Sequence, residues 1–222
     1  MKPKNQQKKF LCIIKDLGLI EYEKAYQIQK LCVEEVLKGN PQSLIICEHP
    51  CVVTLGRLAK EENLLIPHQD IEKKKVKILP IDRGGDMTLH CPGQLVIYPI
   101  LNLKNYGMDL KKYLFHLEQV AIDFLRDFDI LACRKLQQTG VWVGKDKVAS
   151  IGIGVKRWIS FHGMAINVNT DLDLFSMIRP CGLDIRMTSL NNLKGSPINF
   201  RFAKNVFIKK FCQQFHLATS NS

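Results

Sequence analysis

The stretch TGVWVGKDKVASIGIGVKRWISFHGMAINV, residues 139–168, decides the predicted fold. It contains four short β-prone segments, TGVWV, KVASIGIGV, RWISF and MAINV, separated only by Gly, Lys and His residues. Connections this short join antiparallel neighbours, because parallel strands need a crossover of a dozen or more residues. We therefore predict an antiparallel run of strands over these residues.

Three helices are predicted around this run. Apolar residues recur at helical spacing from Ile20 to Lys38, where GNP at 39–41 ends the pattern. Asp109 is placed to cap a second helix, whose apolar stripe extends to Phe128. A third helix spans about 201–215, with these apolar residues in register: Phe202, Val206, Phe207, Phe211 and Phe215.

Shorter segments supply the rest of the predicted sheet. SLIIC and CVVTL lie on either side of EHP, and KKKVKILPI, residues 73–81, alternates in a way that suits a strand with one solvated face. This order of helices and grouped strands predicts an α/β (α+β) fold with a mixed, mostly antiparallel sheet flanked by helices. Because no linker or repeat interrupts the chain, residues 1–222 are predicted to form a single domain.

Composition and charge exclude several classes of protein. No run of about 18 apolar residues is present, so no membrane partner is predicted. The basic N-terminus is not followed by an uninterrupted apolar region, which argues against a secretory signal. Eight cysteines in such a chain indicate reduced thiols and a cytoplasmic location. The net charge of +11 favours an acidic partner without specifying its kind.

The segment CEHPC has a weak resemblance to a metal site. Cys47, His49 and Cys51 fall within five residues, but no second pair of ligands follows at the spacing of a zinc finger. We therefore predict no metal.

The glycine-rich segment DRGGDMTLHCPGQLVIYP, residues 82–99, interrupts the periodic patterns. Gly84 and Gly85 permit unusual backbone angles and a close approach of a ligand, with Arg83 and His90 nearby. The spacing matches neither nucleotide-binding glycine motif. Two readings stay open from the residues alone: a ligand-binding loop, or two tight turns that flank a strand.

The strand that begins near Lys147 combines a cation with very small side chains. Alternation allows the Lys147 ammonium to point into a partly desolvated pocket. Residues with little bulk follow it: Ala149, Ser150, Gly152 and Gly154. They leave room for an extended apolar ligand or for a closely packed neighbouring helix. His162, before Gly163, suggests a structural turn.

Cys181 lies between a proline and a glycine in SMIRPCGLD, residues 176–184. Most free cysteines are packed in the core, but the Pro-Cys-Gly turn restricts burial. A nucleophilic thiol needs a nearby cation or base, for which Arg179 and Lys147 are the candidates.

Four motifs in order carry a family resemblance: EHPCVVTLGR, DRGGDMTLHCPGQLVIYPI, TGVWVGKDKVASIGIGVKRWISFHGMAINVNTDL and RPCGLDIRMTSL. Together, from about residue 45 to 190, they resemble the lipoyl(octanoyl) transferases. These enzymes load octanoate from acyl carrier protein onto lipoyl domains. The resemblance implies a fold like that of the biotin and lipoate protein ligases and no cofactor.

The resemblance also implies roles for individual residues. It makes Cys181 the acyl-thioester nucleophile and Lys147 the residue that holds the thiol as thiolate. Three segments match those that line the acyl pocket in the family. Their residues are Arg83, Gly84, Gly85, Asp86, Met87, Thr88, Leu89 and His90, then Ser150, Ile151 and Gly152, then Gly163, Met164 and Ala165. Cys91 departs from the pattern, because the family usually has a glycine there, and it would be strained if that position has φ > 0.

The implied reaction has two steps. Cys181 takes the octanoyl group from octanoyl-acyl carrier protein, and a lysine of an apo lipoyl domain then accepts it as an amide. The implied acceptors are the lipoyl domains of 2-oxoacid dehydrogenase complexes and the glycine cleavage H protein, with no nucleic-acid partner. These partners are typically acidic, which gives the charge of +11 a role in encounter.

Two alternatives remain at this point. One is an ATP-dependent lipoate or biotin protein ligase of the same fold, which would not need Cys181. The other is a non-catalytic carrier-protein or nucleic-acid binder, although the presence of both Lys147 and Cys181 argues against it.

Overall fold

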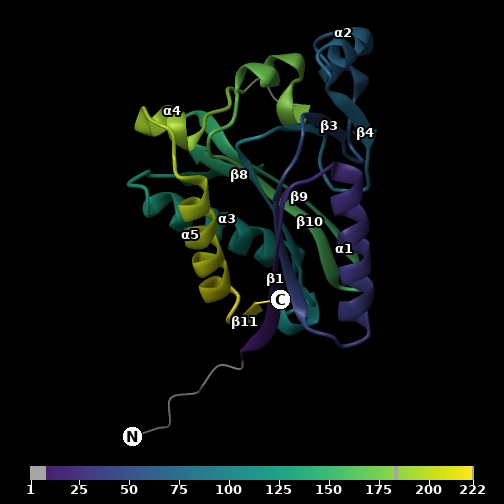
Figure 1. Ribbon diagram of the computed structural model, residues 1–222, viewed down its shortest axis with the longest axis vertical. Coiled ribbons are helices and arrows are strands. Elements are labelled where there is room, and N and C mark those ends of the chain that lie inside the picture. Colours follow the sequence, from purple (N-terminus) through teal and green to yellow (C-terminus); the bar gives the residue numbers. More distant parts are fainter. Residues whose placement is uncertain (1–8, 183–184, 222) are drawn as a thin grey trace, which may run out of the picture.

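A computed structural model describes residues 9–182 and 185–221 (Figure 1). Its strands are β1 (Phe10–Leu19), β2 (Gln42–Glu48), β3 (Val52–Leu55), β4 (Lys77–Pro80), β5 (Met87–His90), β6 (Gln94–Ile100), β7 (Cys133–Lys135), β8 (Gln138–Val143), β9 (Asp146–Lys156), β10 (Ile159–Asn167) and β11 (Leu217–Asn221). Its α-helices are α1 (Tyr22–Leu37), α2 (His68–Lys73), α3 (Leu110–Arg126), α4 (Leu190–Lys194) and α5 (Phe200–Gln214). Short 3₁₀ helices are η1 (Glu61–Asn63), η2 (Leu103–Tyr106), η3 (Asp173–Met177) and η4 (Pro180–Gly182).

The large sheet has the strand order β11-β1-β2-β6-β10-β9-β8-β7. β1 pairs in parallel with both β11 and β2, and the other neighbours pair antiparallel. The predicted mixed, mostly antiparallel sheet is therefore confirmed. The quoted stretch forms β8, β9 and β10, because RWISF and MAINV join into the single strand β10.

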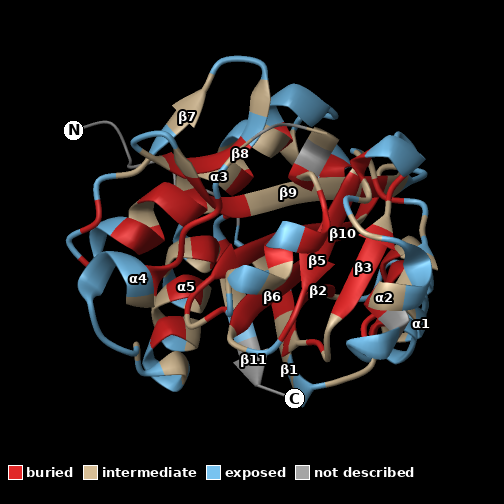
Figure 2. Cartoon of the chain, turned by 90° about the horizontal axis from the view of Figure 1, so that it is seen from above, coloured by how far each residue is buried: buried red, intermediate tan, exposed pale blue. Residues whose placement is uncertain are grey.

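Helices cover both faces of the large sheet. In β2, Leu44 and Ile46 contribute to the core under α3 and α5, whereas Ile45 contributes to a second core under α1. This alternation explains why SLIIC is an unbroken apolar run, since each face of the strand is buried. Figure 1 shows α1 on one side of the sheet and α3 and α5 on the other, and in Figure 2 the central strands are buried while the outer helix faces are exposed.

A second sheet, with the order β4-β3-β5, was not predicted as a separate unit. β3 pairs in parallel with β4 and antiparallel with β5. One face of this sheet forms a third core with the chain segment that precedes Cys181. Its members include Val53, Leu89, Phe175 and Met177. The small sheet thus supports the loop that carries the predicted nucleophile.

Local features confirm some predictions and correct others. The Asp109 Oδ1 atom accepts a hydrogen bond from the Lys112 backbone N–H at 3.0 Å, so the predicted cap of α3 is confirmed. Most of the basic run at 73–77 is not a strand, because α2 ends at Lys73 and β4 begins only at Lys77. In α5, Phe202 was counted in the apolar register, but it is 54% exposed, and Ala203 is buried beside it.

Two further positions differ from what the sequence suggested. His162 lies inside β10 with φ of 54°, so the His-Gly pair interrupts a strand without ending it. Cys91 does not have a positive φ, so the strain considered for a residue in the glycine's place is absent.

Candidate active site

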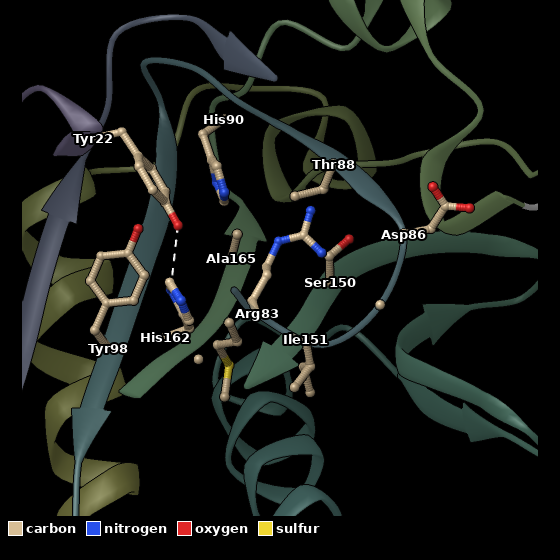
Figure 3. A pocket seen from close by; sticks show the side chains of 14 residues that line it. Tyr22, Arg83, Asp86, Thr88, His90, Tyr98, Ser150, Ile151, His162 and Ala165 are labelled. Atoms are coloured by element: carbon tan, nitrogen blue, oxygen red, sulfur yellow. Dashed lines mark hydrogen bonds between the residues drawn. The ribbon is translucent and has the colours of Figure 1, made fainter. Parts of the chain in front are cut away.

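An inner pocket lies between β5, β6, β9 and β10 (Figure 3). Its lining comprises Tyr22, Arg83, Gly85, Asp86, Thr88, His90, Tyr98, Ser150, Ile151, Gly152, His162, Gly163, Met164 and Ala165. The three segments that the family resemblance matched to an acyl pocket therefore meet around one cavity, although they are far apart in the chain.

Three of the predicted pocket residues lie elsewhere. Met87 and Leu89 belong to the third core, because alternate residues of β5 point to opposite faces and only Thr88 and His90 face the pocket. Gly84 lines the neighbouring cleft described below. The Arg83–His90 segment therefore borders the pocket, but three of its eight residues do not line it.

The glycine-rich segment packs directly on β9. The Gly84 N–H donates to the Ile153 carbonyl at 2.8 Å, and a Cβ on Gly152 would lie 2.8 Å from the Gly84 oxygen. The Arg83 guanidinium donates to the Thr54 carbonyl at 2.7 Å, which ties this segment to β3. The neighbour that requires a glycine at position 152 is therefore a loop, and Gly154 leaves room for the Phe161 ring of β10, so neither is explained by the helix considered from the sequence.

One end of the inner pocket is closed by hydrogen-bonded aromatic side chains. His162 Nε2 donates to the Asp82 carboxylate at 2.8 Å, so its Nδ1 accepts from the Tyr22 hydroxyl at 3.3 Å. His49 Nδ1 donates to the Ile20 carbonyl at 2.7 Å, and its Nε2 accepts from the Tyr98 hydroxyl at 2.7 Å. Figure 3 shows Tyr22, Tyr98 and His162 at this end and Asp86 at the opposite end.

Burial keeps these histidine rings neutral. It lowers the pKa of His90 to about 3 and holds the pKa of His49 and of His162 below the ordinary value. The hydrogen bond of His162 to Asp82 opposes the shift without reversing it. His49, the histidine of the CEHPC segment, is hydrogen-bonded through both ring nitrogens. Within the described ranges no group of three or more His, Cys, Asp or Glu residues is placed to hold a metal ion.

An outer cleft borders the inner pocket, and the two share four lining residues: Gly85, Asp86, Ile151 and Gly152. Lys147 and Gly182 both line this outer cleft. The Lys147 residue is 1% exposed, and its Nζ lies 5.4 Å from the centroid of the Trp142 ring. A Cβ on Gly140 would lie 2.4 Å from the Lys147 Cε, so this glycine leaves the space that the lysine chain occupies.

The chain on either side of Cys181 is anchored at the outer cleft. Upstream, the Arg179 N–H donates to the Asn63 carbonyl at 2.7 Å. Downstream, Lys147 forms a parallel bridge with Met187. Cys181 itself lies in η4, next to Gly182, and its side chain is outside the described part of the structure. The backbone thus brings Lys147 and the Cys181 loop to one cleft.

Sequence reasoning missed Tyr22, Tyr98 and His162 as pocket residues. Tyr22 begins α1 and Tyr98 lies in the middle of β6, where each reads as an ordinary core residue. The positive φ of His162 was the one local irregularity at this end of the pocket, and it is not visible in the sequence.

The comparisons with known proteins agree with this architecture. Residues 21–212 match the lipoyl protein ligase A/B catalytic domain. The octanoyltransferase of Syntrophotalea carbinolica is 44% identical over 193 residues, which are 86% of this chain and 88% of that protein. The octanoyltransferase of Caldicellulosiruptor bescii is 46% identical over 188 residues, which are 83% and 82% of the two chains.

Solved structures show the same fold at low sequence identity. A lipoate-protein ligase A bound with ATP superposes with a TM-score of 0.75 at 14% identity, covering 97% of this chain and 89% of that one. A bipartite lipoate protein ligase from Thermoplasma acidophilum gives a TM-score of 0.74 at 15% identity, with 97% and 87% covered. The chain belongs to the lipoyl protein ligase A/B catalytic domain family. The predicted resemblance to the octanoyltransferases is confirmed by its curated relatives.

Proposed function

We propose that this chain transfers an octanoyl group from octanoyl-acyl carrier protein to a lysine of an apo lipoyl domain, through a thioester on Cys181. The relatives named octanoyltransferase support the reaction class. The observation that carries the assignment of the site is that the two cavities adjoin. The inner pocket shares Ile151 and Gly152 with the cleft that Lys147 and Gly182, the neighbour of Cys181, also line.

The inner pocket suits an alkyl chain. Gly152, Gly163 and Ala165 contribute almost no side-chain bulk along β9 and β10, and Ile151 and Met164 add apolar surface. We call the side of the inner pocket that borders the outer cleft its mouth. An acyl group whose tail enters this pocket places its carbonyl carbon at this mouth.

The chemistry at the mouth proceeds by two acyl transfers. The Cys181 sulfur attacks the carrier thioester, the carrier thiolate leaves, and Lys147 provides the positive charge that favours the attacking thiolate. Backbone N–H groups of the glycine-rich segments at the mouth stabilise the tetrahedral oxyanion. The acceptor lysine, as a neutral amine, then attacks the enzyme thioester and becomes an amide, while Cys181 is regenerated. Because a thioester is converted into an amide, no ATP is consumed.

The partners and the location belong to the same proposal. Acyl carrier proteins and lipoyl domains are acidic, and the charge of +11 favours their encounter at low ionic strength. The H protein of glycine cleavage and the lipoyl domains of 2-oxoacid dehydrogenases are the proposed acceptors. The described cysteines are all free thiols, which supports a reducing compartment such as the cytoplasm. No helix in the described ranges is long and apolar enough to span a bilayer.

The test is an octanoyl-transfer assay from octanoyl-acyl carrier protein to an apo lipoyl domain without ATP. We expect transfer by the wild type, loss of at least about a thousandfold in Cys181→Ala and a large loss in Lys147→Met. Cys133→Ser is the matched control, because Cys133 is an exposed cysteine on β7. Transfer by Cys181→Ala that requires ATP and free octanoate would instead support the ligase alternative.

A further inference from the structure

Cys51 directly precedes β3 and Cys91 directly follows β5, at one end of the small sheet. β3 and β5 pair antiparallel with Val52 opposite His90, so the same register extended by one residue would place Cys51 opposite Cys91. Both cysteines also face the same side, because Cys91 is a member of the third core and Cys51 packs against that core. The extended strand register and the shared contact with the third core are two separate observations that place the two side chains near each other.

The alternation of hydrogen bonds along this ladder indicates which kind of pair the two cysteines would form. The Gly56 N–H donates to the Asp86 carbonyl at 3.1 Å across the β3–β5 ladder, so even-numbered residues near β3 point their backbone groups toward β5. The Cys51 carbonyl accepts from the Lys77 N–H at 3.4 Å, on the opposite side, toward β4. In this pattern the next pair, Cys51 and Cys91, falls at a non-hydrogen-bonded position.

Non-hydrogen-bonded antiparallel pairs are the closest in a sheet, with Cα atoms about 4.5 Å apart. A disulfide needs Cα atoms about 4.4–6.8 Å apart and Cβ atoms on the same side. The register extended by one residue agrees with the first condition, and the contact of both cysteines with the third core agrees with the second.

We propose that a peroxide oxidises Cys51 and Cys91 to a disulfide, at a site separate from the proposed nucleophile. Cys51 is half-buried and reaches solvent, whereas Cys91 is fully buried. The Cys51 sulfur attacks one peroxide oxygen, the O–O bond breaks, and a sulfenic acid and water are formed. The Cys91 sulfur then attacks the sulfenic sulfur and forms the S–S bond, while the sulfenic oxygen leaves as a second water. Two electrons pass from the thiols to the peroxide.

The disulfide would strengthen the sheet that supports the Cys181 loop. It joins the ends of β3 and β5 and closes the intervening chain into a covalent loop, which restricts the unfolded state. Cys91 faces the third core, whereas its neighbour His90 faces the inner pocket, so the bond forms on the side of β5 away from the acyl chain. We therefore expect stabilisation without obstruction of the inner pocket.

The test uses the full-length Cys181→Ala protein, so that the proposed nucleophile cannot exchange with the new bond. After hydrogen peroxide treatment and alkylation of remaining thiols, the protein is digested without reduction and its peptides are identified by mass spectrometry. We expect a linked peptide pair containing Cys51 and Cys91, and a rise in Tm of about 5 °C or more that a thiol reductant reverses.

Two matched variants make the result specific. Adding Cys51→Ser should abolish both the linked peptide and the rise in Tm, whereas adding Cys133→Ser should change neither. Folding of each variant is checked by its Tm before oxidation. Recovery of Cys91 as an alkylated thiol after Cys133 is fully oxidised, or a bond from Cys51 to another cysteine, would overturn the proposal.

Discussion

The closed end of the inner pocket predicts which side chain limits the length of the acyl group. Tyr22 closes this end and hydrogen-bonds to His162 at 3.3 Å, opposite the mouth at Asp86. Replacing Tyr22 by leucine removes the hydroxyl and the far part of the ring, which we expect to make room for about two methylene groups. At about 0.8 kcal/mol for each buried CH₂, the gain for a decanoyl over an octanoyl group is about 1.6 kcal/mol, or about fifteenfold.

The assay compares kcat/KM for decanoyl- and octanoyl-acyl carrier protein. In Tyr22→Leu the ratio should rise about fifteenfold, whereas in Tyr22→Phe, which keeps the ring, it should stay near the wild-type value. Tyr26→Leu is the matched control, because Tyr26 stacks on His162 with ring centroids 5.3 Å apart but is not part of the described lining of the pocket. A ratio that is unchanged in a folded Tyr22→Leu protein would refute the placement of the acyl tail.

Three further predictions concern stability. Burial holds the pKa of His90 at about 3, against about 6.5 in the unfolded chain, so below about pH 6.5 the unfolded state binds more protons than the folded state. The Tm should therefore fall as the pH is lowered from 7 to 5, and it should fall less steeply in His90→Gln. A pH slope that is identical in both proteins would contradict this origin. Asp109→Ala should cost about 1 kcal/mol, seen as a drop of about 2–4 °C in Tm, because the Lys112 N–H loses its acceptor; no drop would show that the cap is unimportant. Gly140→Ala should lower both Tm and transfer, since the new methyl group meets the Lys147 Cε at 2.4 Å and the Ala149 oxygen at 2.6 Å, and normal activity in that variant would argue against this position of the lysine.

The three long helices and half of the strands of the large sheet, β2, β8, β9 and β10, were predictable because they depend on local periodicity. The apolar stripe of α3 and its Asp109 cap are both readable within one segment. The small sheet was not predictable in this way, because β3 and β5 are separated by η1, α2 and β4 and their pairing is set by the third core. The strand β1 was missed because Lys15 and Asp16 interrupt its apolar residues.

For the site, too, contacts between residues far apart in the chain were not predictable from the sequence. The small residues of β9 indicated that something packs closely against this strand, but only the fold shows that the neighbour of Gly152 is the loop at Gly84 and that of Gly154 is the Phe161 ring. The closed end of the pocket combines Tyr22 of α1, Tyr98 of β6 and His162 of β10, which no sequence spacing relates. The roles of Lys147 and Cys181 followed from ordered motifs and a resemblance, and the bridge from Lys147 to Met187 gives the physical reason that the two segments meet.

The most direct measurement of the central claim is the identification of the acylated residue. The protein is mixed with octanoyl-acyl carrier protein without an acceptor, digested, and examined by mass spectrometry with and without hydroxylamine. We predict one octanoyl group, labile to hydroxylamine, on the peptide that contains Cys181, and its transfer to an apo lipoyl domain when that acceptor is added. An enzyme that transfers octanoate while carrying no acyl group on Cys181, or carrying it on another residue, would contradict the account.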